Sequence, residues 1–271
     1  MRISKKEYLE LNEYVELAEA INIVSTMILF CFAKSTNSIK DNILRNFVAR
    51  STISQMSIFA LYELKDYSGA WVIHRTLLDR LFHLHSIGAR DEYVDFDDWS
   101  FFNQYRDQNR LRSDPQFDVE ASGWVYELSD DQKKRIQRLS NNKPQWKRPK
   151  AEDVAKDMGL EFLYKYGYDY ASKLVHPLSD DGLQDFYEIT GLEPRPKYPS
   201  QISVLSNSIL ANTLVIQSAM NSCSLSWVKI LWDLIDSFRL ALDGNLEEYK
   251  LTLVKLCELY KQGEICARKS V

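Results

Sequence analysis

The sequence has few of the residues that interrupt helices. Only 9 glycines and 7 prolines occur among its 271 residues. Proteins built from many short strands need more turn residues than this, so the scarcity favours long helices. No stretch shows the sustained apolar–polar alternation of a strand, and no internal repeat or low-complexity tract occurs. The chain is therefore predicted to be all-α.

Paired cysteines and long apolar runs are also missing. The four cysteines form no C-x-x-C pair and do not stand at metal-ligand spacing from a histidine, so we interpret them as reduced thiols of a cytoplasmic protein. Residues 1–14 are charged and lack the apolar core of a signal peptide. The longest mostly apolar run, residues 21–33, falls short of the roughly 20 residues that span a membrane. We expect it to be a buried core helix, and we expect no membrane partner.

Several functional classes lack their sequence signatures. The formal net charge of -4 gives no overall basic field of the kind that attracts nucleic acid. The P-loop, G-x-G-x-x-G, H-E-x-x-H and G-x-S-x-G motifs do not occur, which argues against ATPase, dinucleotide-binding, zinc-protease and hydrolase functions. The acidic pairs Asp97-Asp98 and Asp180-Asp181 are adjacent in sequence and do not share a helix face. We therefore predict no metal site and no cofactor.

The apolar periodicity divides the chain into helices separated by polar or proline-containing stretches. Gly69 is expected to break the chain between two of them, residues 113–128 look irregular, and residues 190–200 form the best candidate linker. We predict helices at 5–34, 38–65, 70–87, 91–112, 129–139, 151–159, 160–176, 201–240 and 245–262. The predicted architecture is one domain, residues 1–271, formed by an antiparallel bundle of long helices with shorter helices inserted around 113–190. We expect a homo-oligomer held together by the long apolar helices.

One helix carries an unusual concentration of ionisable side chains. Residues 74–85, HRTLLDRLFHLH, hold three of the four histidines, two arginines and an aspartate. At about 100° per residue, Arg75, Asp79 and His83 share one face, while His74 and His85 fall within the apolar arc. We interpret His74 and His85 as neutral core histidines.

The Arg75 face has two interpretations. It is either a solvated face with an exposed Arg75–Asp79 pair, or a buried polar cluster between helices. A buried arginine needs a carboxylate partner, because an unpaired buried charge is very costly.

The order of these motifs resembles a large uncharacterised family of bacterial all-helical proteins, one of the domain-of-unknown-function families. The run R-T-L-L-D at 75–79 is followed by Tyr105-Arg106, then by K-P-Q-W ending at Trp146, and last by Y-G-Y-D-Y-A-S-K-L-V-H-P at 166–177. The resemblance covers about residues 40–180, and we expect the helices at 201–262 to pack on that core. It implies that four residues form one site: Arg75, Asp79, Ser172 and His176. Ser172 and His176 are four residues apart and so share a helix face, although the alternative is that they only cap the helix before Pro177.

The S-x-x-x-H-P end is also distantly similar to HEPN proteins, which are all-helical and many of which are RNases of toxin, antiphage and CRISPR systems. Their signature is an arginine, four to six residues, and a histidine. The run from Arg80 to His85 has this spacing, but its ends lie about 140° apart on a continuous helix. No arginine stands at the corresponding place before His176, so the resemblance implies that one from another helix, such as Arg75, would serve. Further candidates are His83 and Tyr105.

A basic stretch supports a nucleic-acid partner. Residues 133–150, KKRIQRLSNNKPQWKRPK, contain no acidic residue, and they offer a tryptophan that could stack on a base. The candidate nucleic-acid-binding residues are Lys133, Lys134, Arg135, Arg138, Lys143, Trp146, Lys147 and Arg148. The alternative is an exposed loop that balances the acidic residues 91–98.

These observations lead to one functional hypothesis and one alternative. The first is a HEPN-like, RNA-directed defence or stress-response protein that cleaves RNA without a metal. The alternative is a non-catalytic helical module that binds a ligand or another protein.

Overall fold

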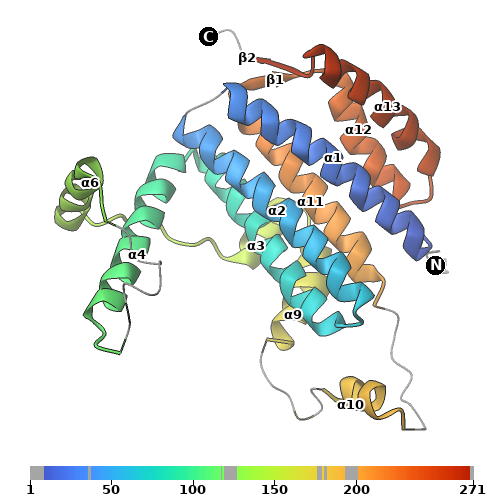
Figure 1. Cartoon of the computed structure of the whole chain (residues 1–271), viewed down its shortest axis with the longest axis horizontal. Coiled ribbons are helices and arrows are strands. Elements are labelled where there is room, and N and C mark those ends of the chain that lie inside the picture. Colours follow the sequence, from blue (N-terminus) through green and yellow to red (C-terminus); the bar gives the residue numbers. More distant parts are fainter. Residues whose placement is uncertain are drawn as a thin grey trace. The chain divides into compact units, whose positions relative to one another are not determined.

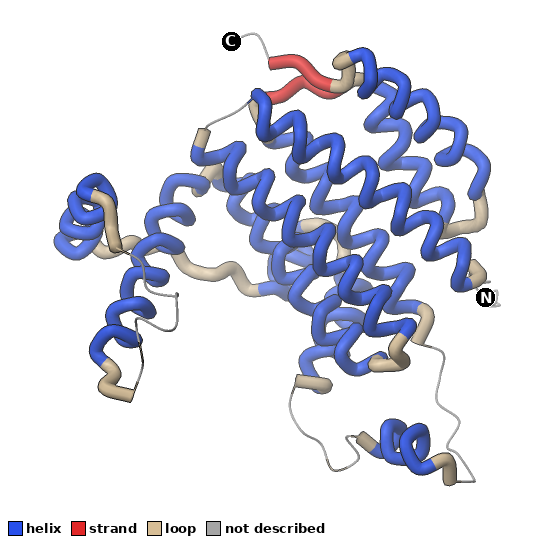
Figure 2. Tube along the Cα trace, in the orientation of Figure 1, coloured by secondary structure: helices blue, strands red, loops and turns tan. Residues whose placement is uncertain are grey.

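The structure is a computed structural model that describes residues 9–35, 38–116, 118, 127–175, 179, 182–192 and 201–268. Helices account for most of these residues, and the strands are short (Figures 1 and 2). The helices are α1 (Leu11–Ser35), α2 (Ile39–Glu63), α3 (Tyr67–Arg90), α4 (Tyr93–Ser113), α6 (Asp130–Asn141), α7 (Ala151–Asp157), α8 (Glu161–Leu163), the π-helical segment η1 (Tyr164–Asp169), α9 (Tyr170–Lys173), α10 (Leu183–Thr190), α11 (Ser203–Ser222), α12 (Lys229–Ala241) and α13 (Leu246–Gln262). The strands are β1 (Leu225–Trp227) and β2 (Cys266–Arg268). The all-α prediction is confirmed.

The chain divides into two compact units. Unit 1 comprises residues 1–86 and 149–271, and unit 2 comprises Ile87–Arg148. The prediction of a single domain stays a prediction.

Unit 1 is built around long helices that lie side by side. Helix α11 packs against α2 and α1, and α12 packs against α13 (Figure 1). The apolar side chains of these helices form the core, among them Leu17, Ile21, Ile28, Leu44 and Ile209. The predicted apolar face of α3 is also buried, with Leu77, Leu78, Leu81, Phe82 and Leu84.

Helix α1 contains the apolar run that the sequence singled out. By length and composition it is long enough to cross a membrane, and 56% of its most apolar window is buried inside the structure. Its inward positions Ile21, Val24 and Ile28 are fully buried. The helix therefore has the burial expected of a core helix, as predicted for residues 21–33.

The start of α3 differs from the prediction. Gly69 lies within the first turn of α3, and its N–H donates to the Asp66 carboxylate at 2.8 Å. The chain turns four residues earlier, at Lys65, which has a φ of 62°. The predicted break at Gly69 is wrong because Asp66 satisfies a free N–H of the helix start and lets the helix begin there.

The helix predicted at 201–240 is also interrupted. Helix α11 ends at Ser222, and β1 pairs antiparallel with β2, so that Trp227 stands opposite Cys266. The break is fixed by Asp41, which is 1% exposed and accepts hydrogen bonds from the N–H and hydroxyl of Ser224 at 2.9 and 2.6 Å. The sequence shows no strand pattern here, because it is this long-range anchor that holds the backbone extended.

The helix predicted at 160–176 is divided into α8, η1 and α9. A π-helical turn holds one residue more per hydrogen-bonded ring than an α-helix, and such turns are frequent at functional sites. Here η1 replaces the middle of the predicted helix. Pro177, the predicted stop, lies outside the described residues.

Candidate functional site

The guanidinium of Arg75 joins α3 to the segment formed by η1 and α9. Its Nε donates to Oγ of Ser172 at 2.9 Å, and its Nη2 donates to the hydroxyl of Tyr168 at 3.3 Å. Its Cζ also lies 4.8 Å from the centre of the Tyr168 ring, which is cation–π distance. Ser172 in turn donates to the backbone oxygen of Tyr168 at 2.8 Å. These contacts hold the guanidinium in one orientation.

Asp79 enters this cluster through Tyr168. The Tyr168 hydroxyl donates to Oδ1 of Asp79 at 3.1 Å while it accepts from Arg75. Burial raises the pKa of Tyr168, the Asp79 carboxylate raises it further, and Arg75 lowers it by less. The phenol therefore stays protonated. Its hydroxyl links the two charged groups, because it donates to the carboxylate and accepts from the guanidinium. We call the residues Arg75, Asp79, Tyr168 and Ser172 the polar centre.

Close packing holds η1 and α9 against α3. The ring of Tyr170 meets Trp71 edge-on with centroids 5.3 Å apart, and Phe82 lies 6.1 Å from Tyr168. A β-carbon at Gly167 would lie 2.9 Å from Cε1 of the buried His74. Only glycine therefore allows η1 to approach α3 this closely.

Replacing Gly167 with alanine is expected to destabilise unit 1 by about 1–3 kcal/mol, because the added methyl overfills a packed contact. The same methyl would stand 3.1 Å from Cδ1 of Leu78, so two buried neighbours would have to move. Urea unfolding of the two proteins measures the change. The matched control is Lys165→Ala, at an exposed position of η1, which should leave the midpoint unchanged. An unchanged midpoint for Gly167→Ala would contradict the packing described.

The structure brings together three of the four residues proposed as one site. Arg75 contacts Ser172 directly, whereas Asp79 connects to Arg75 through Tyr168 instead of pairing with it as expected. His176 lies outside the described residues. Tyr168 was missed by sequence reasoning, although its position four residues before Ser172 places both on one helix face.

The secondary candidates lie elsewhere. Arg80 donates to the backbone oxygen of Thr76 at 2.8 Å and to the Ser54 hydroxyl at 3.3 Å. Arg80 and His85 both lie inside the continuous helix α3, so their side chains point to different sides of the helix and do not meet. His83 and His85 are half-buried on α3, although His85 was predicted to lie in the core. Tyr105, on α4 in unit 2, lies 6.5 Å from the ring of Phe102.

In unit 2, two of the basic candidates are engaged with acidic residues. Arg135 donates to Asp97 at 2.6 Å and to Asp98 at 2.9 and 2.6 Å, and its guanidinium lies 4.4 Å from the Phe101 ring centre. Arg138 bonds both oxygens of Asp98, at 3.0 and 2.9 Å. These pairs connect α6 to α4. The adjacent Asp97 and Asp98 are therefore the ion-pair partners of these two arginines.

Trp146 is part of an aromatic cluster and is 7% exposed. Its ring lies 4.7 Å from that of Trp99 and 4.9 Å from that of Phe96, and its Nε1 donates to Glu92 at 3.1 Å. The ring is therefore covered on unit 2 itself. The expectation that it offers an open face for base stacking is wrong, because burying an indole on other aromatic rings is more favourable than exposing it.

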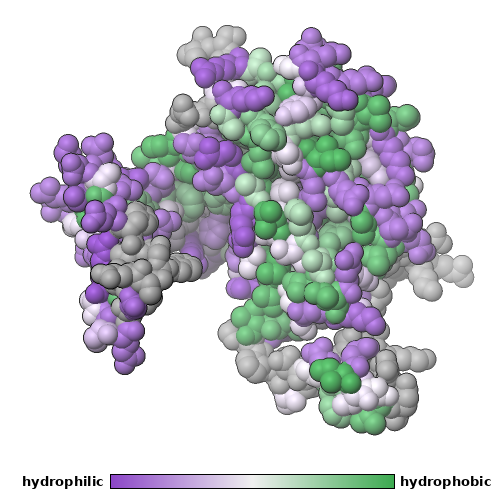
Figure 3. Space-filling view, viewed as in Figure 1, coloured by the Kyte–Doolittle hydropathy of each residue, from purple (hydrophilic) through white to green (hydrophobic). Residues whose placement is uncertain are grey.

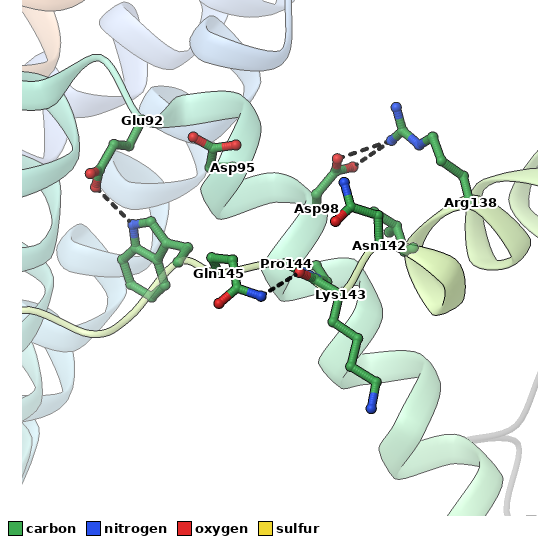
Figure 4. Close-up of a pocket in the computed structure, with 10 residues that line it drawn as sticks. Glu92, Asp95, Asp98, Arg138, Asn142, Lys143, Pro144 and Gln145 are labelled. Carbon is green, nitrogen blue, oxygen red and sulfur yellow. Dashed lines mark hydrogen bonds and ion pairs between the residues drawn. The ribbon is translucent and has the colours of Figure 1, made fainter.

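Beside Trp146 lies an open pocket of about 390 Å³ between α4 and the segment after α6 (Figure 4). In its lining Asp98 bonds Arg138 directly, and Glu92 accepts a hydrogen bond from the Trp146 indole. Asp95, Asn142 and Lys143 also line it. Among the described residues, no group of three or more His, Cys, Asp or Glu side chains is arranged to hold a metal ion.

The remaining basic candidates are exposed. Lys143, Lys147 and Arg148 are exposed, and the guanidinium of Arg148 lies 5.7 Å from the Trp99 ring centre. Lys133 and Lys134 make exposed ion pairs with Asp130 and Asp131, which hold these side chains only weakly. On the face drawn in Figure 3, the side chains of α6 are mostly hydrophilic.

The fold and the polar centre define an all-α protein with a polar cluster between a long helix and a π-helical segment. The model of a family of unknown function, DUF5677, matches residues 41–188, which is more than half of the chain. The chain belongs to this family, and the resemblance expected over residues 40–180 is confirmed to that extent. Neither the curated proteins nor the solved structures contain a match.

Proposed function

We propose that this protein is a HEPN-like, RNA-directed defence or stress-response protein whose polar centre cleaves RNA without a metal ion. The hydrogen bond from Arg75 to Ser172 is the observation that supports this best. It ties an arginine of α3 to a serine that stands four residues before His176. The proposal therefore unites an arginine and a histidine that lie in distant parts of the sequence.

The chemistry assigns each residue one role. His176 accepts the proton of a ribose 2′-hydroxyl, and the 2′-oxygen attacks the neighbouring phosphorus. The bond from phosphorus to the 5′-oxygen breaks, and that oxygen takes up a proton. The products are a 2′,3′-cyclic phosphate and a 5′-hydroxyl. Arg75 stabilises the charge that builds on the phosphoryl oxygens, held in place by Tyr168 and Ser172.

Exposed basic side chains support an RNA partner. Lys143, Lys147 and Arg148 are available to phosphates, because they lie at the surface of unit 2. Contacts between such side chains and the phosphate backbone of RNA give affinity without sequence preference. Arg135 and Arg138 are committed to Asp97 and Asp98 and act as supports for this surface.

One observation favours the alternative of a non-catalytic helical module that binds a ligand or another protein. The donors of Arg75 are partly used by Ser172 and Tyr168, and Asp79 completes the chain of hydrogen bonds. A half-buried hydrogen-bond network of this sort can serve only to fix how helices pack. The two functions differ in whether RNA is cleaved.

The test is cleavage of a labelled RNA by the purified full chain in the presence of EDTA. The wild type is expected to produce 2′,3′-cyclic phosphate ends, and His176→Ala is expected to produce none. In a bacterial host, the wild type should be toxic and His176→Ala harmless. Lys173→Ala, which alters an exposed side chain beside Ser172, is the control and should cleave as the wild type does.

Absence of cleavage by a folded wild type would remove the nuclease and leave the interaction module. Equal cleavage by His176→Ala would overturn the role of His176 as the base.

A further inference from the structure

Two cysteines from distant parts of the sequence meet beside the small sheet of unit 1. Cys266 on β2 stands opposite Trp227 on β1, and the Trp227 ring meets Phe32 edge-on with centroids 5.9 Å apart. Phe32 follows Cys31 near the end of α1. Residues directly opposite one another in an antiparallel pair point to the same face, so the Cys266 side chain is directed with the Trp227 ring toward the end of α1. Cys31 and Cys266 are hydrogen-bonding neighbours there, and both are free thiols.

The surroundings make the two thiols unequal. The hydrogen bond from Cys31 lowers the pKa of Cys266, burial opposes this, and the nearby Lys34 ammonium lowers it further. The same hydrogen bond and burial raise the pKa of Cys31. The proton therefore stays on Cys31, and Cys266 is the better thiolate. Cys31 is only 6% exposed, whereas Cys266 is half-buried and so the more accessible sulfur.

We propose that Cys31 and Cys266 form a redox-active pair that hydrogen peroxide converts into an intramolecular disulfide. Thiolate character and access are what make a cysteine react with peroxide, and a second thiol in contact is what resolves the product. Both conditions meet at this pair.

The reaction has two balanced steps. The Cys266 thiolate attacks one peroxide oxygen, the O–O bond breaks, and the departing hydroxide takes up a proton to give water and a sulfenic acid. The Cys31 sulfur then attacks that sulfenic sulfur, the S–O bond breaks, and the hydroxide leaves as water with the Cys31 proton. Peroxide is reduced to two water molecules, and two thiols are oxidised to one disulfide. Oxidation of Cys266 removes its hydrogen bond and its negative charge, two of the causes that raise the pKa of Cys31, while burial continues to raise it.

The other two cysteines have different surroundings. Cys223 accepts a hydrogen bond from the Trp227 indole at 3.2 Å and is 3% exposed. Cys257 lies on α13. The disulfide would thus tie the C-terminal strand to the end of α1, which lie near one another in Figure 1.

The experiment uses the reduced full chain, treated with hydrogen peroxide and then alkylated with N-ethylmaleimide. Two of the four thiols should be lost, and non-reducing peptide mass spectrometry should find the Cys31 peptide linked to the Cys266 peptide. Dithiothreitol should restore both thiols. Cys31→Ser should leave a sulfenic acid on Cys266 that dimedone traps, and Cys257→Ser, the matched control, should form the link as the wild type does.

Three results would overturn the proposal. They are a link that involves Cys223 or Cys257, a disulfide between two chains, and a Cys266 sulfenic acid that persists in the wild type. Because Ser replaces a half-buried thiol in Cys266→Ser, that variant serves as a second check. It should lose no thiol at a peroxide dose that oxidises the wild type fully.

Discussion

Replacing Arg75 with lysine is expected to slow RNA cleavage by about 100-fold to 1,000-fold, the usual cost of removing one donor that faces a developing negative charge. Lysine keeps the positive charge but has no planar fork, so its single nitrogen cannot occupy the separate positions of Nε and Nη2 that bond Ser172 and Tyr168. Single-turnover cleavage measures the effect on the chemical step. Arg90→Lys is the matched control, because Arg90 is on the same helix and its side chain is 64% exposed.

Tyr168→Phe separates the hydroxyl from the ring. It keeps the aromatic face beside the guanidinium and removes the hydrogen bonds to Arg75 and Asp79. Cleavage should fall by about tenfold or more, since a hydrogen bond to a charged group contributes roughly 1.5 kcal/mol or more and the hydroxyl makes two. Full activity of Arg75→Lys would show that the guanidinium geometry has no part in the reaction, and the role assigned to Arg75 would be abandoned.

The second large effect concerns the stability of the protein as a function of pH. His74 is 0% exposed, and burial lowers its pKa to about 4. In the unfolded chain the imidazole has its ordinary pKa of 6.5. Between about pH 4 and pH 6.5, the unfolded state therefore binds a proton that the folded state does not bind. The stability is complete above about pH 6.5 and decreases as the pH falls toward 4, by roughly 3 kcal/mol in all.

Urea unfolding of wild type and His74→Leu at several pH values between 7 and 4 measures this. Carboxylates titrate in the same range in both proteins, so the difference between the two curves isolates the histidine. The wild type should lose roughly 3 kcal/mol more than His74→Leu over this interval. Parallel curves would mean that His74 takes up a proton without unfolding, contrary to its burial among Trp71, Gly167 and Leu78.

Much of the fold could be predicted from local sequence. The N-terminal ends of α2 and α6 follow from Ser38 and Ser129. Each of these side chains accepts a hydrogen bond from the backbone N–H three residues further along the chain. The buried leucines of α3 follow from their spacing around the helix. In each case the information lies within one or two helical turns, which is the range over which a sequence pattern reports structure.

The departures from the predictions have long-range causes. Asp41 extends the backbone at Ser224 and so ends α11 where the apolar pattern continues. Gly167 approaches His74 closely from within the π-helical turn η1, in a stretch that reads as a plain helix. In both cases the partner residue is distant in the sequence from the segment that departs from the predicted helix, so the local pattern does not report it.

The polar centre was likewise predictable from local sequence only in part. The sequence placed Arg75 and Asp79 on one face of a helix and Ser172 on another helix, because residues four apart share a face. It did not single out Tyr168, because the tyrosine matters only through partners 93 and 89 residues away in the sequence.

By itself, then, the sequence determined the helical class of this protein, the faces of its long helices and the family to which it belongs. Only the tertiary structure decided which polar side chains meet, that the Trp146 ring is covered, and that Cys31 and Cys266 are neighbours. The physical reason is that helix formation and face polarity depend on neighbours a few residues away. Hydrogen bonds between helices depend instead on how the whole bundle excludes water.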